Sequence, residues 1–221
     1  MAAILVIFAM FLLRGVLLRN GTIDRMYTLE PDALHDAVSK YEVAVRADGV
    51  TGAGTILDGR KQSTKDENYT LTVVTAAHAV GSADAVQLVL SDGTQLDAEV
   101  ISSDPEQDLA FLQCAWPEEL EVYYSRDILD RLAAQDPVYG LKGADHNELA
   151  SGVVKDSAAS VDGIGQDLIL ADIGDASGMS GGGLYGKAGN YLGMIVQETG
   201  DGKTACIPAD IVMAKMKEVL Q

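Results

Sequence analysis

Three short motifs carry the residue types that nucleophilic hydrolysis requires. Thr75-Ala-Ala-His78 ends an apolar run, Asp108-Leu-Ala110 begins another, and Gly178-Met-Ser-Gly-Gly182 lies in a glycine-rich segment. A serine hydroxyl is a poor nucleophile until a base takes its proton, and an imidazole is a suitable base near neutral pH. A carboxylate beside the imidazole fixes its tautomer and stabilises the charge that forms. The histidine, aspartate and serine of these motifs are therefore candidates for acyl-transfer chemistry.

The order of the motifs adds to this interpretation. The histidine and the aspartate lie in the first half of the sequence, and the serine follows in the second half. Such an order fits two compact lobes that meet at a cleft. Each motif alone is a weak signal, but the three together favour an authentic catalytic set.

Short β-strands are the elements that must position these residues. Apolar and β-branched runs alternate with turn residues, and Ser91-Asp-Gly-Thr94 is typical of a hairpin. The pattern predicts strands at residues 43–45, 55–57, 69–75, 86–90, 95–102, 109–114, 138–141, 152–156, 168–172, 183–185, 191–197 and 204–207. A helical connector at 125–134 and a C-terminal helix at 209–220 complete an all-β arrangement of two lobes.

The N-terminus is an apolar run that stands apart from this body. Residues 2–18 are long enough, at the short end of the range, to span a bilayer. We expect a single-pass membrane anchor there. A buried helix of the folded body is the alternative, and a cleaved signal peptide fits less well because no basic residue precedes the run. Three arginines follow it, which by the positive-inside rule would leave the body in the cytoplasm.

Composition excludes several classes of function. The 221 residues include 16 basic and 33 acidic ones, a net charge of −17, so nucleic-acid binding is not expected. Cys114 and Cys206 are the two cysteines, and we expect them to be buried free thiols in different lobes. The three histidines are too scattered to form a zinc motif, so no metal and no other cofactor is expected. His35 and His146 are expected to be solvated.

From about residue 43 to residue 208 the chain resembles the trypsin-like serine peptidases of the chymotrypsin fold, and among them the bacterial HtrA/Deg type. Besides the three motifs, Thr51-Gly-Ala-Gly-Thr-Ile-Leu57 is similar to the entry strand of this family, and Leu192-Gly-Met194 to the strand after its nucleophile. The resemblance implies two six-stranded antiparallel β-barrel lobes. It also implies a serine endopeptidase that cleaves a polypeptide substrate through an acyl-enzyme intermediate.

The same resemblance implies a role for each candidate residue. His78 would be the general base, Asp108 its orienting partner and Ser180 the nucleophile. The backbone N–H groups of Gly178 and Ser180 would form the oxyanion hole. Glycines around the serine permit the backbone angles that aim both donors inward.

Substrate-binding residues also follow from the resemblance. Gly174, which precedes the nucleophile by six residues, would be the base of the primary specificity pocket. A glycine there supplies no carboxylate, which argues against a simple preference for arginine or lysine. Gly193, Met194 and Ile195 would bind an extended peptide by β-addition.

Two positions depart from the HtrA pattern. Met179 stands where an asparagine is usual before the nucleophile, and Gly183 where a proline is usual after the second glycine. Neither side chain takes part in the chemistry. The departures put the rigidity of the loop in question, but not the activity. No peptide-binding PDZ module is expected.

Two other functions are compatible with parts of this sequence. Gly-x-Ser-x-Gly also matches the nucleophile elbow of the α/β-hydrolases, but no histidine follows Ser180 in this sequence. The alternative that stays open is a catalytically inactive trypsin-like fold that acts as a membrane-tethered binding or scaffold module. The presence of all three triad residues favours the enzyme.

The expected organisation is an anchored catalytic body, with the oligomeric state left open. Its parts are an anchor and flank (1–26), a juxtamembrane linker and helix (27–42), an N-terminal barrel lobe (43–117), a connector (118–137), a C-terminal barrel lobe (138–208) and a closing helix (209–221). By the resemblance, the body lies on the extracytoplasmic side, against the indication of the arginines.

Overall fold

The computed structural model describes residues 28–61, 69–116, 119–142, 148–160, 166–174 and 176–221. The anchor expected at residues 1–26 and the solvated histidine expected at position 146 lie outside the described residues. Within that part of the chain, no helix has both the length and the apolar character that crossing a bilayer requires.

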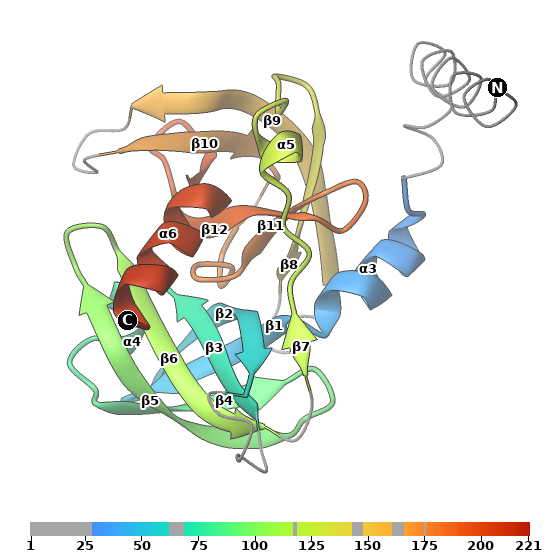
Figure 1. Cartoon of the computed structure of the whole chain (residues 1–221). Coiled ribbons are helices and arrows are strands. Elements are labelled where there is room, and N and C mark those ends of the chain that lie inside the picture. Colours follow the sequence, from blue (N-terminus) through green and yellow to red (C-terminus); the bar gives the residue numbers. More distant parts are fainter. Residues whose placement is uncertain (1–27, 62–68, 117–118, 143–147, 161–165, 175) are drawn as a thin grey trace, which may run out of the picture.

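An antiparallel barrel forms the first half of the body (Figure 1). Its strands are β1 (Glu42–Ala47), β2 (Val50–Arg60), β3 (Tyr69–Thr75), β4 (Ala85–Leu90), β5 (Gln95–Asp104) and β6 (Leu109–Trp116). They pair in the order β1–β4–β5–β6–β3–β2, and β2 pairs back with β1 to close the ring. A short strand, β7 (Leu120–Glu121), extends this sheet beyond β2.

A second antiparallel barrel follows in the chain. Its strands are β8 (Pro137–Lys142), β9 (Glu148–Ser160), β10 (Asp167–Asp172), β11 (Gly183–Gly186), β12 (Tyr191–Glu198) and β13 (Thr204–Pro208). They close in the order β10–β13–β12–β11–β8–β9. The prediction of two six-stranded antiparallel barrels is therefore confirmed. The alternation of β-branched and turn residues was a reliable guide because both barrels are built from short strands and tight connections.

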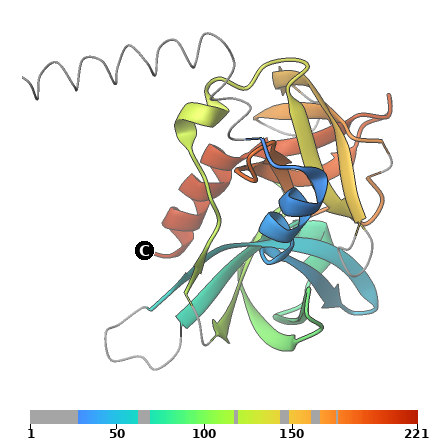
Figure 2. The ribbon, with the colours of Figure 1, turned by 90° about the vertical axis from the view of Figure 1, so that its right-hand side faces the viewer.

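Helices connect and cover the barrels. The described helices are α3 (Pro31–Ser39), α4 (Ala77–Val80), α5 (Arg126–Leu129) and α6 (Ala209–Val219). α6 confirms the predicted C-terminal helix and packs against β12 and β13, and Figure 2 shows it extending from the second barrel toward the first. The connector helix expected at 125–134 is shorter than predicted: it ends at Leu129, and a turn in which Asp136 accepts the N–H of Ala133 at 2.9 Å precedes β8.

Three apolar clusters make up the core. One lies inside the first barrel and one inside the second. The third fills the space between the barrels and joins Leu57 and Phe111 of the first barrel to Tyr185 and Met194 of the second. Leu34 of α3 belongs to this third cluster and is fully buried. α3 is therefore packed against the body.

One carboxyl group is buried where the barrels meet. Glu42, the first residue of β1, is 1% exposed. Its Oε1 accepts a hydrogen bond from the hydroxyl of Thr55 in β2 at 3.0 Å and from the hydroxyl of Tyr185 in β11 at 2.6 Å. The N–H of Gly183, also in β11, lies 3.1 Å from Oε1 and 3.3 Å from Oε2. Glu42 therefore links the two barrels through hydrogen bonds.

Burial controls the ionisation of this carboxyl. Desolvation raises the pKa of Glu42 from 4.5 to about 7, while the hydrogen bonds from Tyr185, Thr55 and Gly183 act in the opposite direction. A folded-state pKa above the unfolded value means that folding favours the protonated form. This contribution to stability is fully present below pH 4.5 and is lost as the pH rises through about 7.

We predict that Glu42→Gln removes this pH dependence. Relative to the variant, the free energy of unfolding of the wild-type protein should fall by roughly 3 kcal/mol as the pH rises through this window. Urea unfolding at several pH values on either side of the pKa measures the difference. If the two proteins showed parallel stability profiles, the assignment of the titration to Glu42 would be wrong.

We also predict that Leu34→Ala destabilises the body by about 2–5 kcal/mol, because it leaves a cavity between α3 and the barrels. Leu220→Ala is the matched control, since the same truncation there removes a side chain that is 43% exposed. The loss in the free energy of unfolding, measured with urea, should be much smaller for Leu220→Ala than for Leu34→Ala. Equal costs would contradict the packing of α3 described above.

Candidate active site

The histidine and aspartate motifs meet because β3 and β6 are paired. In the antiparallel register Thr75 lies opposite Ala110, so the residues after β3 come beside those before β6. His78 belongs to α4, the single turn that follows β3, and Asp108 directly precedes β6. Nδ1 of His78 lies 2.8 Å from Oδ2 and 3.0 Å from Oδ1 of Asp108. The structure thus brings these two predicted residues together.

Asp108 is held by more than the imidazole. Its Oδ1 also accepts the backbone N–H of His78 at 3.0 Å. Its backbone φ is +52°, a left-handed conformation that is uncommon for a residue other than glycine. The side chain is 21% exposed, against 55% for His78. The Asp108 carboxylate is therefore held against the Nδ1 side of an imidazole that is itself more than half exposed.

Ser180 comes from the second barrel, in the loop before β11. Its Oγ lies 3.1 Å from Nε2 of His78, the ring nitrogen that Asp108 does not contact. The Ser180 hydroxyl also donates to the carbonyl oxygen of Val196 in β12. The three predicted triad residues therefore form a continuous series of contacts across the two barrels.

The loop that carries Ser180 is packed closely on the first barrel. The N–H of Ala53 donates to the carbonyl oxygen of Ser180 at 3.0 Å, and the N–H of Gly181 donates to that of Ile195 at 2.7 Å. Gly181 has a φ of +91°, and a Cβ there would lie 2.1 Å from the carbonyl oxygen of Ala53 and 2.6 Å from Oγ1 of Thr75. Only glycine fits this position, because both the backbone angle and the space exclude a side chain.

The backbone N–H groups of Gly178 and Ser180 differ from that of Met179, which lies between them in the chain. Gly178 has a φ of +78° and is exposed. The N–H of Met179 donates to Ala176 at 3.0 Å, whereas no backbone carbonyl of the described residues accepts the N–H of Gly178 or Ser180. These are the two groups that the sequence predicted for an oxyanion hole, and that role stays a prediction.

The two departures from the HtrA pattern both contribute contacts to this loop. Met179 is fully buried, and its Cε would lie 2.4 Å from a Cβ added at Gly140, so the side chain fills the space above that glycine. Gly183 supplies the N–H that Glu42 accepts, which a proline could not do. Apolar packing and a buried carboxyl therefore restrain the loop.

The predicted substrate-binding residues lie in two places, Gly174 before the serine loop and the other three in β12. Gly174 is exposed, with a φ of +72° and open space where a Cβ would be. Gly193, Met194 and Ile195 are buried in β12, and their backbones are paired with β11, β13 or the serine loop. Beyond Ile195, which is hydrogen-bonded to the serine loop, residues 196–198 of β12 have no β11 partner among the described strands. A role in substrate binding stays a prediction for all four residues.

Two features of the site were missed in the sequence. Glu42 was assigned to the end of the linker, although a carboxylate at the start of an apolar strand was a signal that it needed buried partners. The carbonyl of Val196 is a backbone group, and its direction depends on a β-bulge between Ile195 and Gln197. No side-chain pattern could have identified it.

The remaining titratable groups lie apart from this chemistry. Cys114 and Cys206 are buried free thiols, as predicted. Burial raises the pKa of the Cys114 thiol to about 11 and that of Cys206 still further, so neither is an activated nucleophile. In the part of the chain that the structure describes, no cluster of histidine, cysteine and carboxylate side chains could hold a metal ion.

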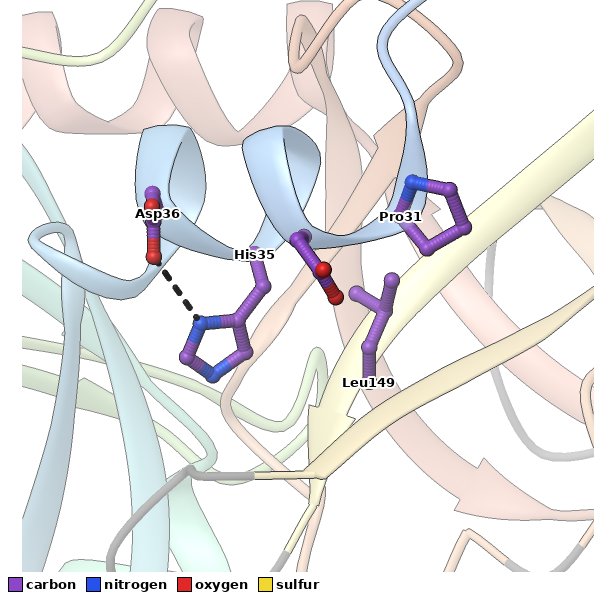
Figure 3. A pocket seen from close by; sticks show the side chains of 5 residues that line it. Pro31, His35, Asp36 and Leu149 are labelled. Atoms are coloured by element: carbon purple, nitrogen blue, oxygen red, sulfur yellow. Dashed lines mark ion pairs between the residues drawn. The ribbon is translucent and has the colours of Figure 1, made fainter.

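A pocket formed by α3 and β9 is separate from the triad. It is lined by Pro31, Asp32, His35, Asp36 and Leu149, as Figure 3 shows. Nδ1 of His35 lies 3.7 Å from Oδ1 of Asp36, and the His35 side chain is 30% exposed. The expectation that His35 is solvated is therefore met only in part, because its Nε2 is buried where α3 lies beside Leu149 of β9.

The arrangement of His78, Asp108 and Ser180 can activate a hydroxyl group. Asp108 occupies Nδ1, which leaves Nε2 to accept the proton of Ser180. The Ser180 oxygen could then attack a carbonyl carbon, and the N–H groups at positions 178 and 180 could stabilise the negative charge that develops. This is the chemistry of acyl transfer.

The comparisons with known proteins agree with this chemistry. A probable periplasmic serine endoprotease, DegP-like, from Brucella suis is 34% identical over 128 residues, which cover 55% of this chain and 24% of that protein. The periplasmic serine endoprotease DegP of Escherichia coli K12 is 30% identical over 152 residues, which cover 65% of this chain and 29% of that protein. The chain matches less than a third of the length of these relatives.

A family model supports the same assignment over a longer segment. The model of the trypsin-like peptidase domain matches residues 52–194, more than half of the chain. The match begins in β2 of the first barrel and ends in β12 of the second, so it covers most strands of both barrels and the segments that carry the histidine, the aspartate and the serine. Because the barrels, the order of the motifs and this match all agree, the chain belongs to the family of trypsin-like peptidase domains.

Proposed function

We propose that this chain is a serine endopeptidase in which Ser180 is the nucleophile, His78 the general base and Asp108 its orienting partner. The observation that carries the proposal is the 3.1 Å contact between Oγ of Ser180 and Nε2 of His78, which joins residues of two barrels. The names of the matched relatives, both serine endoproteases, support the same activity. A catalytically inactive scaffold would not require the contact between Ser180 and His78.

The proposed reaction proceeds in two halves. In acylation, Oγ of Ser180 bonds to the substrate carbonyl carbon while its proton moves to Nε2 of His78. The N–H groups of Gly178 and Ser180 stabilise the oxyanion. His78 then returns the proton to the leaving amine as the C–N bond breaks. In the second half, water attacks the acyl-enzyme by the same route and releases the acid and the free serine.

The open part of β12 is the proposed docking edge for the peptide. Residues 196–198 lack a β11 partner among the described strands, so an extended peptide could pair there. The Val196 carbonyl that this edge presents now accepts the Ser180 hydroxyl. A peptide N–H that took over this carbonyl would leave the serine proton directed at His78. Substrate binding would then favour activation of the nucleophile.

We propose a preference for an uncharged side chain in the primary specificity pocket. Gly174 supplies no carboxylate. Asp172, which is close to it in sequence, is paired with Lys155 at 3.0 Å. Asp175 lies outside the described residues. Profiling the cleavage of a peptide library tests this preference, and dominant cleavage after arginine or lysine would contradict it.

We further propose that the N-terminal segment tethers the body to a membrane, with the catalytic residues on the extracytoplasmic side. The apolar run at residues 2–18 supports the tether. The matched relatives are named as periplasmic proteins, which supports the location.

We predict that Ser180→Ala lowers kcat for peptide hydrolysis by about 10⁴-fold or more and leaves the fold intact, because the hydroxyl contributes chemistry rather than packing. His78→Ala should be similarly damaging, and the double variant little worse than either, since the two residues act as one unit. Steady-state kinetics on a cleaved peptide and urea unfolding of each variant measure these effects. Turnover at the wild-type rate by purified Ser180→Ala would show that the triad assignment is wrong.

Deleting residues 1–26 is predicted to release a soluble body that keeps its peptidase activity, because all three proposed catalytic residues lie in the barrels. The full-length chain should instead partition with membranes and resist extraction by carbonate. Membrane flotation of both proteins measures the difference. A full-length chain that stayed in the soluble fraction would refute the anchor.

A further inference from the structure

The buried carboxyl of Glu42 lies directly behind the loop that carries Ser180. It contacts two consecutive residues of the glycine run that follows the serine. The N–H of Gly183 is 3.1 Å from Oε1, and a Cβ added at Gly182 would be 2.9 Å from Oε2. The carboxyl group is thus packed against the segment that joins the nucleophile to β11.

The partners of Glu42 fit the ionised form of the carboxyl. The hydroxyls of Thr55 and Tyr185 and the N–H of Gly183 all donate to it. An ionised carboxylate accepts every one of these bonds and makes them stronger through its charge. The N–H of Gly183 can only donate, so its bond weakens when the carboxyl takes up a proton.

The groups around Glu42 do not change their own charge near neutral pH. The titratable side chains that face Glu42 are Tyr185 from β11 and Tyr191 from β12, and their rings pack edge to face with centroids 6.0 Å apart. Burial raises the pKa of both phenols well above 10, so they stay neutral around pH 7. Thr55, from β2, does not titrate, and no lysine, arginine or histidine of the described residues forms an ion pair with Glu42. Glu42 is therefore the group in this cluster whose charge changes near neutral pH.

The loop depends on such external contacts because it has little stiffness of its own. Gly181, Gly182 and Gly183 follow the serine, and glycine restricts the backbone less than any other residue. Backbone hydrogen bonds hold the Ser180 carbonyl, the Gly181 N–H and both the N–H and the carbonyl of Gly182, and the Gly183 N–H donates to Glu42. The last of them involves a side chain that can change its charge.

We infer that Glu42 is a positioning residue for the nucleophile: its ionised carboxylate holds the Gly181–Gly183 segment in place behind Ser180, and protonation loosens that hold. The inference rests on the proposed serine-peptidase function. Glu42 acts through the loop and touches neither the substrate nor the reacting atoms. Its effect is on turnover rather than on peptide binding, because the docking edge of β12 is formed by other residues.

The first test of the inference compares the kinetic constants of Glu42→Gln with those of the wild-type protein. The amide is nearly isosteric but has no charge and only one acceptor oxygen. Above the pH at which Glu42 ionises, kcat for peptide hydrolysis should fall about tenfold while KM stays within about twofold of wild type. Glu99→Gln is the matched control, since Glu99 is an exposed residue of β5, and it should leave both constants unchanged. Unchanged kcat in a folded Glu42→Gln protein would overturn the inference.

The dependence of kcat on pH is a second test, and its measurement on the wild-type enzyme does not need the variant to fold. In the wild-type enzyme both the His78 imidazole and the Glu42 carboxyl must lose a proton, so the acid limb of log kcat against pH should approach a slope of two. In Glu42→Gln the slope should return to one. A wild-type acid limb that requires a single ionisation would overturn the inference.

The outcomes separate this inference from the function on which it rests. Failure of the wild-type protein to hydrolyse any peptide would overturn the proposed function and the inference with it. Active wild-type enzyme with a single ionisation and an unaffected Glu42→Gln variant would overturn the inference alone. Active enzyme with two ionisations, one of which the variant loses, supports both.

Discussion

The close approach of one glycine to one carbonyl determines where the nucleophile lies. Gly181 packs so tightly on β2 that a Cβ would come within 2.1 Å of the carbonyl oxygen of Ala53. The neighbouring hydrogen bond from Ala53 to Ser180 fixes the same point of the loop. Since an error of about 1 Å in the position of a reacting group can cost two orders of magnitude in rate, this backbone contact is what lets a serine of one barrel reach a histidine of the other. Pairing of β3 with β6 accounts for the rest of the triad, because it places Asp108 beside His78.

At the contact between the barrels, stability and the proposed function favour different charge states of the Glu42 carboxyl. Burial of Glu42 at 1% exposure raises its pKa to about 7, so the ionised form is disfavoured in the folded protein. The same ionised form is the one that best satisfies the Gly183 N–H. A carboxyl that served packing alone could be replaced by an apolar side chain at a gain in stability, as buried charges often can. Its position behind a glycine-rich nucleophile loop gives it a use that packing does not explain.

The sequence was sufficient to predict the two barrels, since strand periodicity and turn residues are local signals, and it placed the C-terminal helix at 209–220 against the observed 209–219. The sequence also identified His78, Asp108 and Ser180, because residue types and their order along the chain are visible without a structure. The structure brings these three residues together. The sequence could not locate the Val196 carbonyl or the partners of Glu42, which depend on a bulge and on the packing of one barrel against the other. The connector helix was overestimated, because the helical spacing of Ile128, Leu129 and Leu132 extends past Leu129, where the observed helix ends. Local pattern thus predicted the elements, and tertiary contacts determined the environment of the site.

Labelling by a fluorophosphonate probe is the most direct test of the proposed triad, because the probe reacts with a serine only when a base activates it. We expect that the wild-type protein is labelled, that mass spectrometry of its peptides maps the adduct to Ser180, and that His78→Ala abolishes labelling while the protein stays folded. Absence of labelling in folded wild-type protein, or an adduct on another residue, would contradict the account. Equal labelling of His78→Ala would show that Ser180 does not depend on the imidazole 3.1 Å away.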